Sequence, residues 1–225
     1  MENLITEGRY DQVTTELSRE IVQAIKKGVK RYTTRIVLFS RTFIDIVANI
    51  KYDDDQNIDV SGGAYLNPKQ VRSYFKNKRI TFHIIVPKTE SLMYQNLTDV
   101  IIPELKGTIR HEIEHIAQFR FKDRQRKNFF SSGRGYPQDI TYEEYLSEPY
   151  EIEAFVRGMY KKAKTIGVPL NVILNDFWDY LESENLSDQN IEKIKKLYTD
   201  YAKKHLYYDS QRKFGFVWDT NDGEN

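Results

Sequence analysis

The first ninety residues change from one hydrophobic period to another. From Tyr10 to Lys27, apolar residues recur every three or four positions, which predicts an amphipathic helix. Two later segments, 36–52 and 58–63, are rich in Ile, Val or Gly and are separated by an acidic run, and this pattern predicts a β-hairpin. The segment Ile80 to Val86 alternates between two faces and stops at Pro87, as a third strand does.

Beyond Thr89 the helical period takes over. Helices are predicted over about Leu97–Phe121, Pro149–Ile166, Leu170–Leu181 and Asp188–Tyr207. The first two are separated by the segment Lys122–Ser147, which is long enough to be a lid or a mobile insertion. The order of elements predicts an α+β fold with a small N-terminal antiparallel sheet and a C-terminal helical lobe.

A single domain is expected over residues 1–225, because one hydrophobic core commonly organises a chain of this length. We distinguish four parts within it. Residues 1–90 form a helix with a small sheet, and residues 91–166 form the active-site helices with their connecting loop. Residues 167–218 form the C-terminal helices, and residues 219–225 form a polar tail.

The composition of the chain limits which metal ligands and which partners it can have. The chain has no Cys, which excludes disulfides, thiolate nucleophiles and cysteine zinc sites, so any metal must be held by His and carboxylate groups. Lys and Arg number 34 against 33 Asp and Glu, and this balance makes nucleic acid an unexpected partner. There is no membrane-spanning apolar run and no signal-peptide pattern at the start, so neither a membrane partner nor export by that route is expected.

Residues 111–115 read His-Glu-Ile-Glu-His, the HExxH pattern, and contain two of the four histidines of the chain. On a helix, His111 and His115 lie one turn apart on the same face, so both imidazoles can reach one ion. Glu112 then lies beside the ion, where it can accept a proton from the water that attacks a substrate. The spacing predicts a catalytic metal centre.

A catalytic zinc ion needs a third protein ligand. Metzincins supply it from an extended HExxHxxGxxH motif, but here Gln118 and Phe121 occupy the last two defining positions, which excludes that class. A carboxylate from another helix is therefore the natural candidate.

Two carboxylates near the start of the next predicted helix, Glu151 and Glu153, point about 200° apart, so only one of them can face the metal. Glu151 is favoured, because its face continues through Ala154 and Gly158, small residues that permit close helix packing. Glu153 shares a side with Arg157 and is expected in an exposed ion pair, although it stays open as the alternative ligand.

With these motifs the chain resembles the gluzincins, zinc metallopeptidases with HExxH on one helix and a Glu ligand on a following one. More narrowly, RHEIEHIAQ at 110–118 and EPYEIEAFVRGMYKKAK at 148–164 are similar to small proteins of tailed bacteriophages that are grouped with peptidases. The resemblance implies a zincin-like domain that binds one zinc ion per chain through His111, His115 and Glu151, with Glu112 as general base. It identifies no substrate.

Other polar residues are weaker candidates. Tyrosines 136, 142, 145 and 150 lie near Glu151 and could stabilise an oxyanion, but none is selected. His83 and His205 are expected to be packed or surface residues. The basic run from Arg120 to Lys127 is interpreted as a solvated helix end in preference to a nucleic-acid contact.

The sequence therefore predicts a zinc metalloendopeptidase whose partner is a protein or peptide substrate. An extended substrate is expected to pair with the strand at Ile80–Val86. The alternative is a phage virion structural or assembly protein that keeps the zincin fold and metal site with little or no proteolysis. Either role suits the cytoplasm of an infected bacterium or the virion, with phage structural proteins as possible partners.

Overall fold

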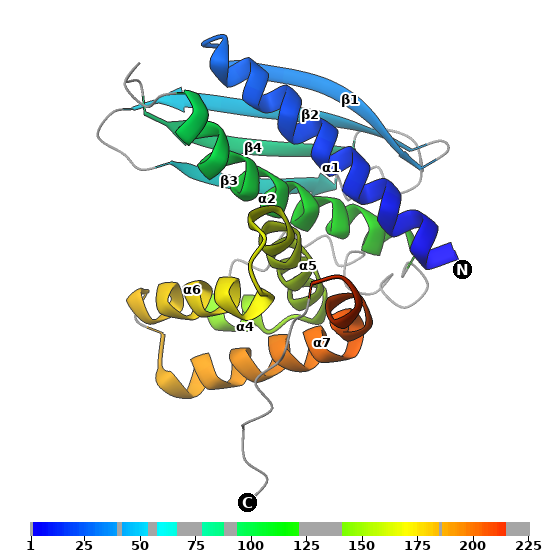
Figure 1. The fold of residues 1–225 in the computed structure, drawn as a ribbon, viewed down its shortest axis with the longest axis vertical. Coiled ribbons are helices and arrows are strands. Elements are labelled where there is room, and N and C mark those ends of the chain that lie inside the picture. Colours follow the sequence, from blue (N-terminus) through cyan, green and yellow to red (C-terminus); the bar gives the residue numbers. More distant parts are fainter. Residues whose placement is uncertain are drawn as a thin grey trace, which may run out of the picture. The chain divides into compact units, whose positions relative to one another are not determined.

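The computed structural model describes residues 2–39, 42–53, 58–66, 78–87, 94–121, 141–184 and 186–214 (Figure 1). The chain divides into two compact units, residues 1–138 and 139–225. The first combines helices with a sheet, and the described part of the second is helical. The predicted α+β class is confirmed, whereas the assignment of both units to one domain stays a prediction.

The first unit contains a four-stranded sheet in the order β1-β2-β4-β3. β1 and β2 are antiparallel, β2 and β4 are parallel, and β4 and β3 are antiparallel. The expectation of a purely antiparallel sheet is therefore wrong, because the sheet is mixed. The elements of this unit are α1 (Glu2–Lys26), β1 (Arg31–Phe39), β2 (Thr42–Tyr52), β3 (Asp59–Leu66), β4 (Lys78–Val86) and α2 (Tyr94–Phe121).

The predicted pairing of 36–52 with 58–63 is also wrong. The segment 31–52 forms a hairpin by itself, made of β1 and β2, and β3 pairs with β4 instead. β2 and β4 each contain four Ile or Val residues, more than β1 or β3, so placing them at the centre of the sheet buries more apolar surface. β3, with Ser61, Gly62 and Gly63, is left at the edge.

The nomination of Ile80–Val86 as the strand that pairs with a substrate fails for the same reason. β4 is hydrogen-bonded to β2 on one side and to β3 on the other, so it has no free edge. The strand itself is confirmed, and so is its alternation, because Ile80, Phe82, Ile84 and Val86 are all buried.

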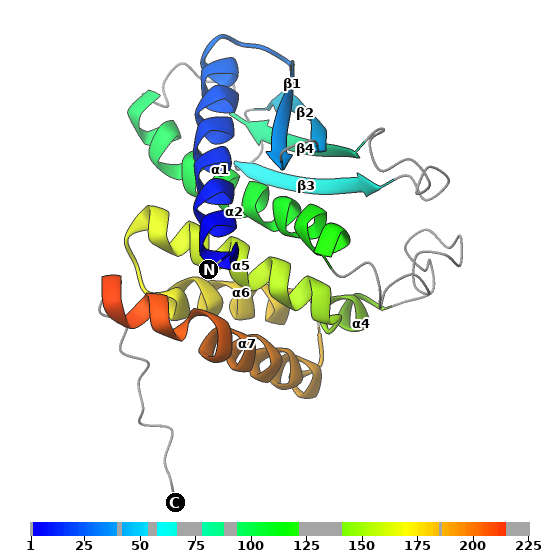
Figure 2. The ribbon, with the colours of Figure 1, turned by 90° about the vertical axis from the view of Figure 1, so that its right-hand side faces the viewer.

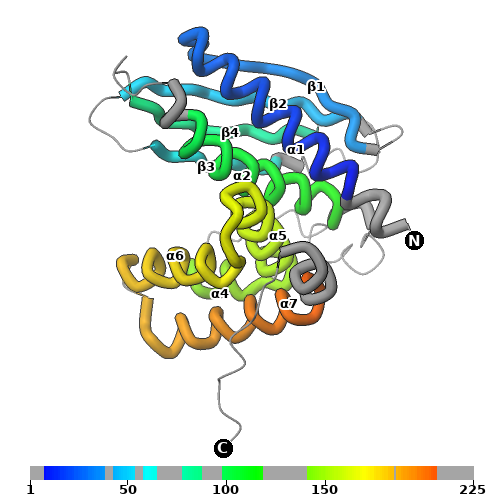
Figure 3. The backbone as a smooth tube through the Cα atoms, in the orientation of Figure 1, coloured from blue at the N-terminus to red at the C-terminus, as the bar shows by residue number. Residues whose placement is uncertain are grey.

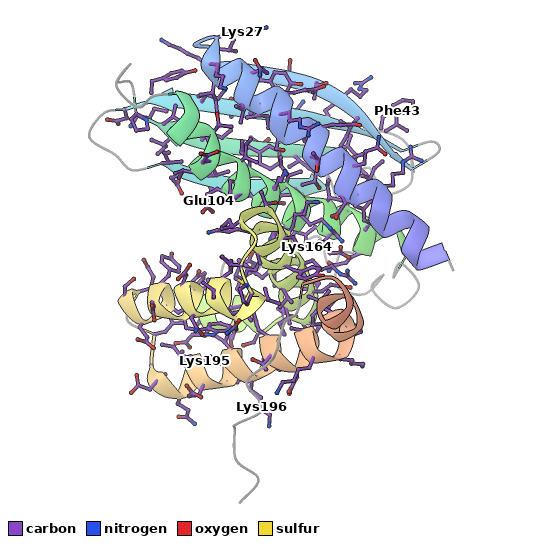
Figure 4. All side chains as sticks on the ribbon, viewed as in Figure 1. Lys27, Phe43, Glu104, Lys164, Lys195 and Lys196 are labelled. Carbon is purple, nitrogen blue, oxygen red and sulfur yellow. The ribbon has the colours of Figure 1, made fainter. Side chains whose placement is uncertain are left out.

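Helices α1 and α2 cover one face of the sheet (Figures 1 and 2). α1 confirms the helix predicted from Tyr10, and it buries Leu17 and Ile21 in the core against the sheet. The opposite sheet face carries residues such as His83 and Phe43, and Phe43 is 54% exposed (Figure 4). The core of this unit thus lies between the sheet and the two helices.

α2 confirms the helix predicted over Leu97–Phe121 and begins three residues earlier. An apolar stripe faces the core of the first unit, and each of its members is 0% exposed: Leu105, Ile109, Ile113 and Ile116. Burial of this stripe fixes which side of α2 faces away from the core, and that side carries the histidines.

The second unit is built from α4 (Tyr142–Leu146), α5 (Pro149–Ile166), α6 (Leu170–Ser183) and α7 (Asp188–Phe214). The three long helices, α5, α6 and α7, confirm the predicted ones (Figure 3). They pack around a core that includes Trp178 and Tyr198. α4 was not predicted, and a capping box between Thr141 and Glu144 begins it. In the described residues, no helix has the length and apolar character needed to cross a bilayer.

Two predictions fall on parts of the chain outside the described residues. One is residues 122–140, which make up most of the predicted lid and contain the basic run from Lys122 to Lys127. The other is the polar tail, residues 219–225.

Candidate metal centre

His111 and His115 lie one turn apart on the same face of α2. Their Nε2 atoms are 3.0 Å apart, and their rings meet edge to face with centroids 4.6 Å apart at an angle of 86°. The spacing i, i+4 on a continuous helix produces this arrangement, because it brings two side chains to one side of the helix. The two ring nitrogens therefore converge on one point.

The distance between the two nitrogens suits a shared ion. Two imidazoles bound to one zinc ion at about 2.0–2.1 Å in a tetrahedral site hold their nitrogens roughly 3.3 Å apart. The observed separation of 3.0 Å differs from this by an amount that a small rotation of either ring removes. Without an ion, one ring must donate a hydrogen bond to the other, since two neutral nitrogens without a proton repel. The histidine pair thus fits a metal.

Glu112 occupies the position expected of a general base. Its side chain is 5% exposed, and Oε1 lies 3.9 Å from Nε2 of His111. The sheet lies along this side of the helix, where the hydroxyl of Thr108 donates a long hydrogen bond of 3.4 Å to the carbonyl of Val60 in β3. A buried carboxylate beside a histidine pair can accept a proton in a setting of low polarity.

The side of α2 that meets α1 carries charged residues that the local sequence pattern does not single out. Arg110 forms a buried ion pair with Glu114, and its guanidinium lies over the ring of Tyr10 in α1, with Cζ 5.3 Å from the ring centroid. Opposite charges four residues apart on a helix are a recognisable signal. Their burial, however, depends on α1, which the local pattern does not reveal.

Glu151 lies in the first turn of α5, in the second unit, and its side chain is fully buried. Its carboxylate acts electrostatically on Tyr198 of α7 and, after burial, is the next cause that raises the pKa of that phenol above its usual value. Ala154 and Gly158, the small residues of the same face, are buried too. The histidines belong to the first unit, so the joining of Glu151 to them stays a prediction.

Glu153 is engaged within the second unit. Its Oε1 accepts a hydrogen bond of 3.0 Å from the hydroxyl of Tyr201 and lies 3.9 Å from Nε of Arg157. The predicted pairing with Arg157 is present, but the description of it as exposed is wrong, since the two side chains are only 14% and 19% exposed. Burial is the main cause that raises the pKa of Tyr201 above its ordinary value. Glu153 therefore has partners within α5 and α7 of the second unit.

The remaining candidates stay unselected. Tyr136 lies outside the described residues, and Tyr142, the first residue of α4, is 42% exposed. His83 is exposed on the sheet face that lies away from α1 and α2. His205 is exposed and stacks on Tyr201 with ring centroids 4.4 Å apart, so it has a structural contact of its own.

Comparisons of this chain with models of protein families, with curated proteins and with solved structures found no match.

Proposed function

We propose that this protein is a zinc-dependent metallopeptidase with a zincin-like arrangement of sheet and active-site helix. The observation that carries the proposal is the pair of Nε2 atoms of His111 and His115, 3.0 Å apart, next to the buried carboxylate of Glu112. Two converging imidazoles with a neighbouring carboxylate form the donor set and the base of HExxH hydrolases.

In this proposal His111, His115 and Glu151 hold one zinc ion per chain. Two imidazoles and one carboxylate form a ligand set that catalytic zinc ions use, and the absence of Cys leaves no softer competitor. Glu153 is the poorer third ligand, because Tyr201 and Arg157 already engage its carboxylate. When bound, zinc would polarise the carbonyl of the scissile peptide and acidify a water molecule.

Glu112 has the role of proton carrier. Its carboxylate accepts a proton from the attacking water as the new carbon–oxygen bond forms, and it later delivers that proton to the leaving amine as the peptide bond breaks. Its burial suits this role, since a carboxylate removed from water takes up a proton more readily than a solvated one. The histidines orient the site and take no proton themselves.

An extended substrate is expected at β3. Among the strands that the structure describes, β4 is its one hydrogen-bonded neighbour, and β3 borders α2 through the contact between Val60 and Thr108. Unpaired backbone groups of an edge strand can pair with a peptide and hold its carbonyl groups in register. β3 therefore replaces β4 in the sequence-based expectation.

The function is tested by comparing wild type with Glu112→Gln. Glutamine keeps the size of the side chain but cannot accept the proton, so hydrolysis of an unstructured protein should fall by about 10²–10⁴-fold. Zinc content and melting temperature should stay at the wild-type values. Glu104→Gln, on the same helix (Figure 4), is the matched control and should cleave like wild type.

The same assay separates a peptidase from a virion structural or assembly protein with a zincin fold. A peptidase should lose cleavage when zinc is chelated and regain it when zinc is restored. If wild type and Glu112→Gln cleave neither unstructured proteins nor phage virion components, and phage assembly proceeds normally with the variant, the peptidase proposal fails.

A further inference from the structure

Gly62 lies on β3 at a point where there is no room for a side chain. It pairs in register with Phe82 of β4, on the sheet face that meets α2. A methyl group in the position of a Cβ atom would lie 3.0 Å from Cγ2 of Thr108, 3.1 Å from Cγ of Glu112 and 3.1 Å from Cδ1 of Phe82. All three distances are shorter than ordinary van der Waals contact, so at least one neighbour would have to move.

Backbone conformation does not account for this glycine. In the described part of the chain, positive φ angles occur at Gly28 and Gly167, and Gly62 is not among them. A glycine inside a strand weakens the strand, because it orders a flexible backbone and contributes no side chain to packing. The close approach of its neighbours, which leaves little space for a Cβ atom, explains why glycine is present here.

The three neighbours differ in how easily they can yield. Phe82 is 0% exposed and lies in the close-packed core between sheet and helices. Thr108 is tied to β3 through its hydroxyl, which donates to the carbonyl of Val60. Glu112 has the longest and most flexible side chain of the three, so a new methyl group would displace Glu112 most easily.

We propose that Gly62 is a positioning residue for Glu112, and that the absence of a side chain at this point of β3 keeps the carboxylate beside His111. The effect on catalysis rests on the proposed peptidase function, whereas the contact itself does not. Relief of the clash requires a neighbour to move by a few tenths of an ångström. Since a displacement of about 1 Å in a catalytic group can cost roughly 10²-fold in rate, such a shift should cost several-fold. Gly62→Ala should therefore impair proton transfer without removing any ligand or base.

The first test is a kinetic comparison of wild type, Gly62→Ala and Gly8→Ala. Gly62→Ala should lower kcat by about 3–10-fold, while KM and zinc affinity stay within about twofold of wild type. Gly8→Ala is the matched control, because a Cβ atom at Gly8 in α1 would have nothing within 4 Å. It should leave all three quantities unchanged. A Gly62→Ala enzyme with wild-type kcat would overturn the proposal.

Thr108→Ser separates positioning from a general loss of stability. Serine lacks Cγ2 but keeps the hydroxyl that bonds to Val60, so adding Thr108→Ser to Gly62→Ala should recover part of any lost melting temperature. The new methyl group would still press on Glu112, so kcat should stay low. Recovery of kcat in step with melting temperature would show a merely structural role and overturn the proposal.

A third measurement needs no cleavage at all. Glu112→Ala removes Cγ, whereas Glu112→Gln keeps it. Gly62→Ala should therefore lower the melting temperature by about 2–4 °C in the Gln background, as expected for a modest clash in a chain of this size, and by much less in the Ala background. Equal shifts in both backgrounds would refute the contact. If this coupling is found but wild type cleaves nothing, the peptidase function fails and the contact stands.

Discussion

Arg110 and Glu114 form a buried ion pair in the first unit, on the side of α2 that meets Tyr10 of α1. Nη1 of Arg110 lies 2.6 Å from Oε2 of Glu114, and the two side chains are only 4% and 9% exposed. The same guanidinium lies over the ring of Tyr10 in α1. Both partners belong to α2, so the contact of Arg110 with Tyr10, and not the ion pair itself, links this side of α2 to α1.

Glu114→Ala should destabilise the protein by about 3–5 kcal/mol, because it leaves the charge of Arg110 buried without its partner. Denaturant unfolding measures this loss. Glu192→Ala is the matched control, since Glu192 pairs with Lys195 on the surface of α7 with its side chain 72% exposed. It should cost less than about 1 kcal/mol. Equal effects of the two substitutions would show that the buried pair has no special role.

The two carboxylates at the start of α5 should differ in their effect on zinc. Loss of a partner that merely orients a ligand lowers metal affinity by about 10–100-fold, so loss of the ligand itself in Glu151→Ala should lower it by roughly 100-fold or more. Glu153→Ala should leave zinc affinity close to wild type and instead reduce stability, because Tyr201 and Arg157 lose their partner. Isothermal titration calorimetry with zinc measures the zinc affinity of both variants. Loss of zinc in Glu153→Ala alone would reverse the assignment.

Stability at alkaline pH should depend on Tyr198. Burial is the main cause that raises the pKa of this phenol above its ordinary value, which is about 10 in an unfolded chain. The folded state therefore keeps the proton at a pH where the unfolded state releases it. The contribution is fully present below about pH 10 and is lost as pH rises towards the folded pKa.

Tyr198→Phe removes this group. Between about pH 9 and pH 11, the free energy of unfolding should therefore fall less in the variant than in wild type. The hydroxyl of Tyr198 is buried with no hydrogen-bond partner in the described residues, so its removal should cost less than about 1 kcal/mol at neutral pH. Denaturant titrations across this range measure both effects. A variant with the wild-type pH dependence would contradict the expected titration.

The sequence was a good guide wherever local periodicity decides the structure. The apolar stripe of α2, from Leu105 to Ile116, determines which side of the helix is buried, and the HExxH spacing then brings the histidines together. α5 begins at Pro149, as predicted, which places Glu151 in its first turn. In each case residues within a few turns of one helix carry the information.

Strand order could not be obtained in the same way. The parallel pairing of Ile46 with Ile80 joins residues that are far apart in sequence, and it depends on how the whole sheet buries its apolar face. A hairpin between neighbouring segments is locally as plausible, and so the edge strand was misassigned. The close approach of Gly62 to Glu112 depends on that strand order, since β3 borders α2 only because β4 lies inside the sheet.

The burial of charged groups also could not be predicted from the local sequence pattern. Glu153 and Arg157 are two polar residues one turn apart, which usually indicates a solvated helix face. In the structure Tyr201 of α7 lies against them and donates a hydrogen bond to Glu153. The partner helix, nearly fifty residues further along the chain, decides the outcome.

The most direct test of the account is the zinc content of the purified protein, measured together with its melting temperature before and after chelation. Wild type should hold one zinc ion per chain and melt at a lower temperature without it, because the ion binds the folded state. His111→Ala and His115→Ala should each abolish binding, since neither keeps three protein ligands. Stoichiometric zinc in both variants, or a wild type that binds none when zinc is supplied, would contradict the metal centre on which the proposed function depends.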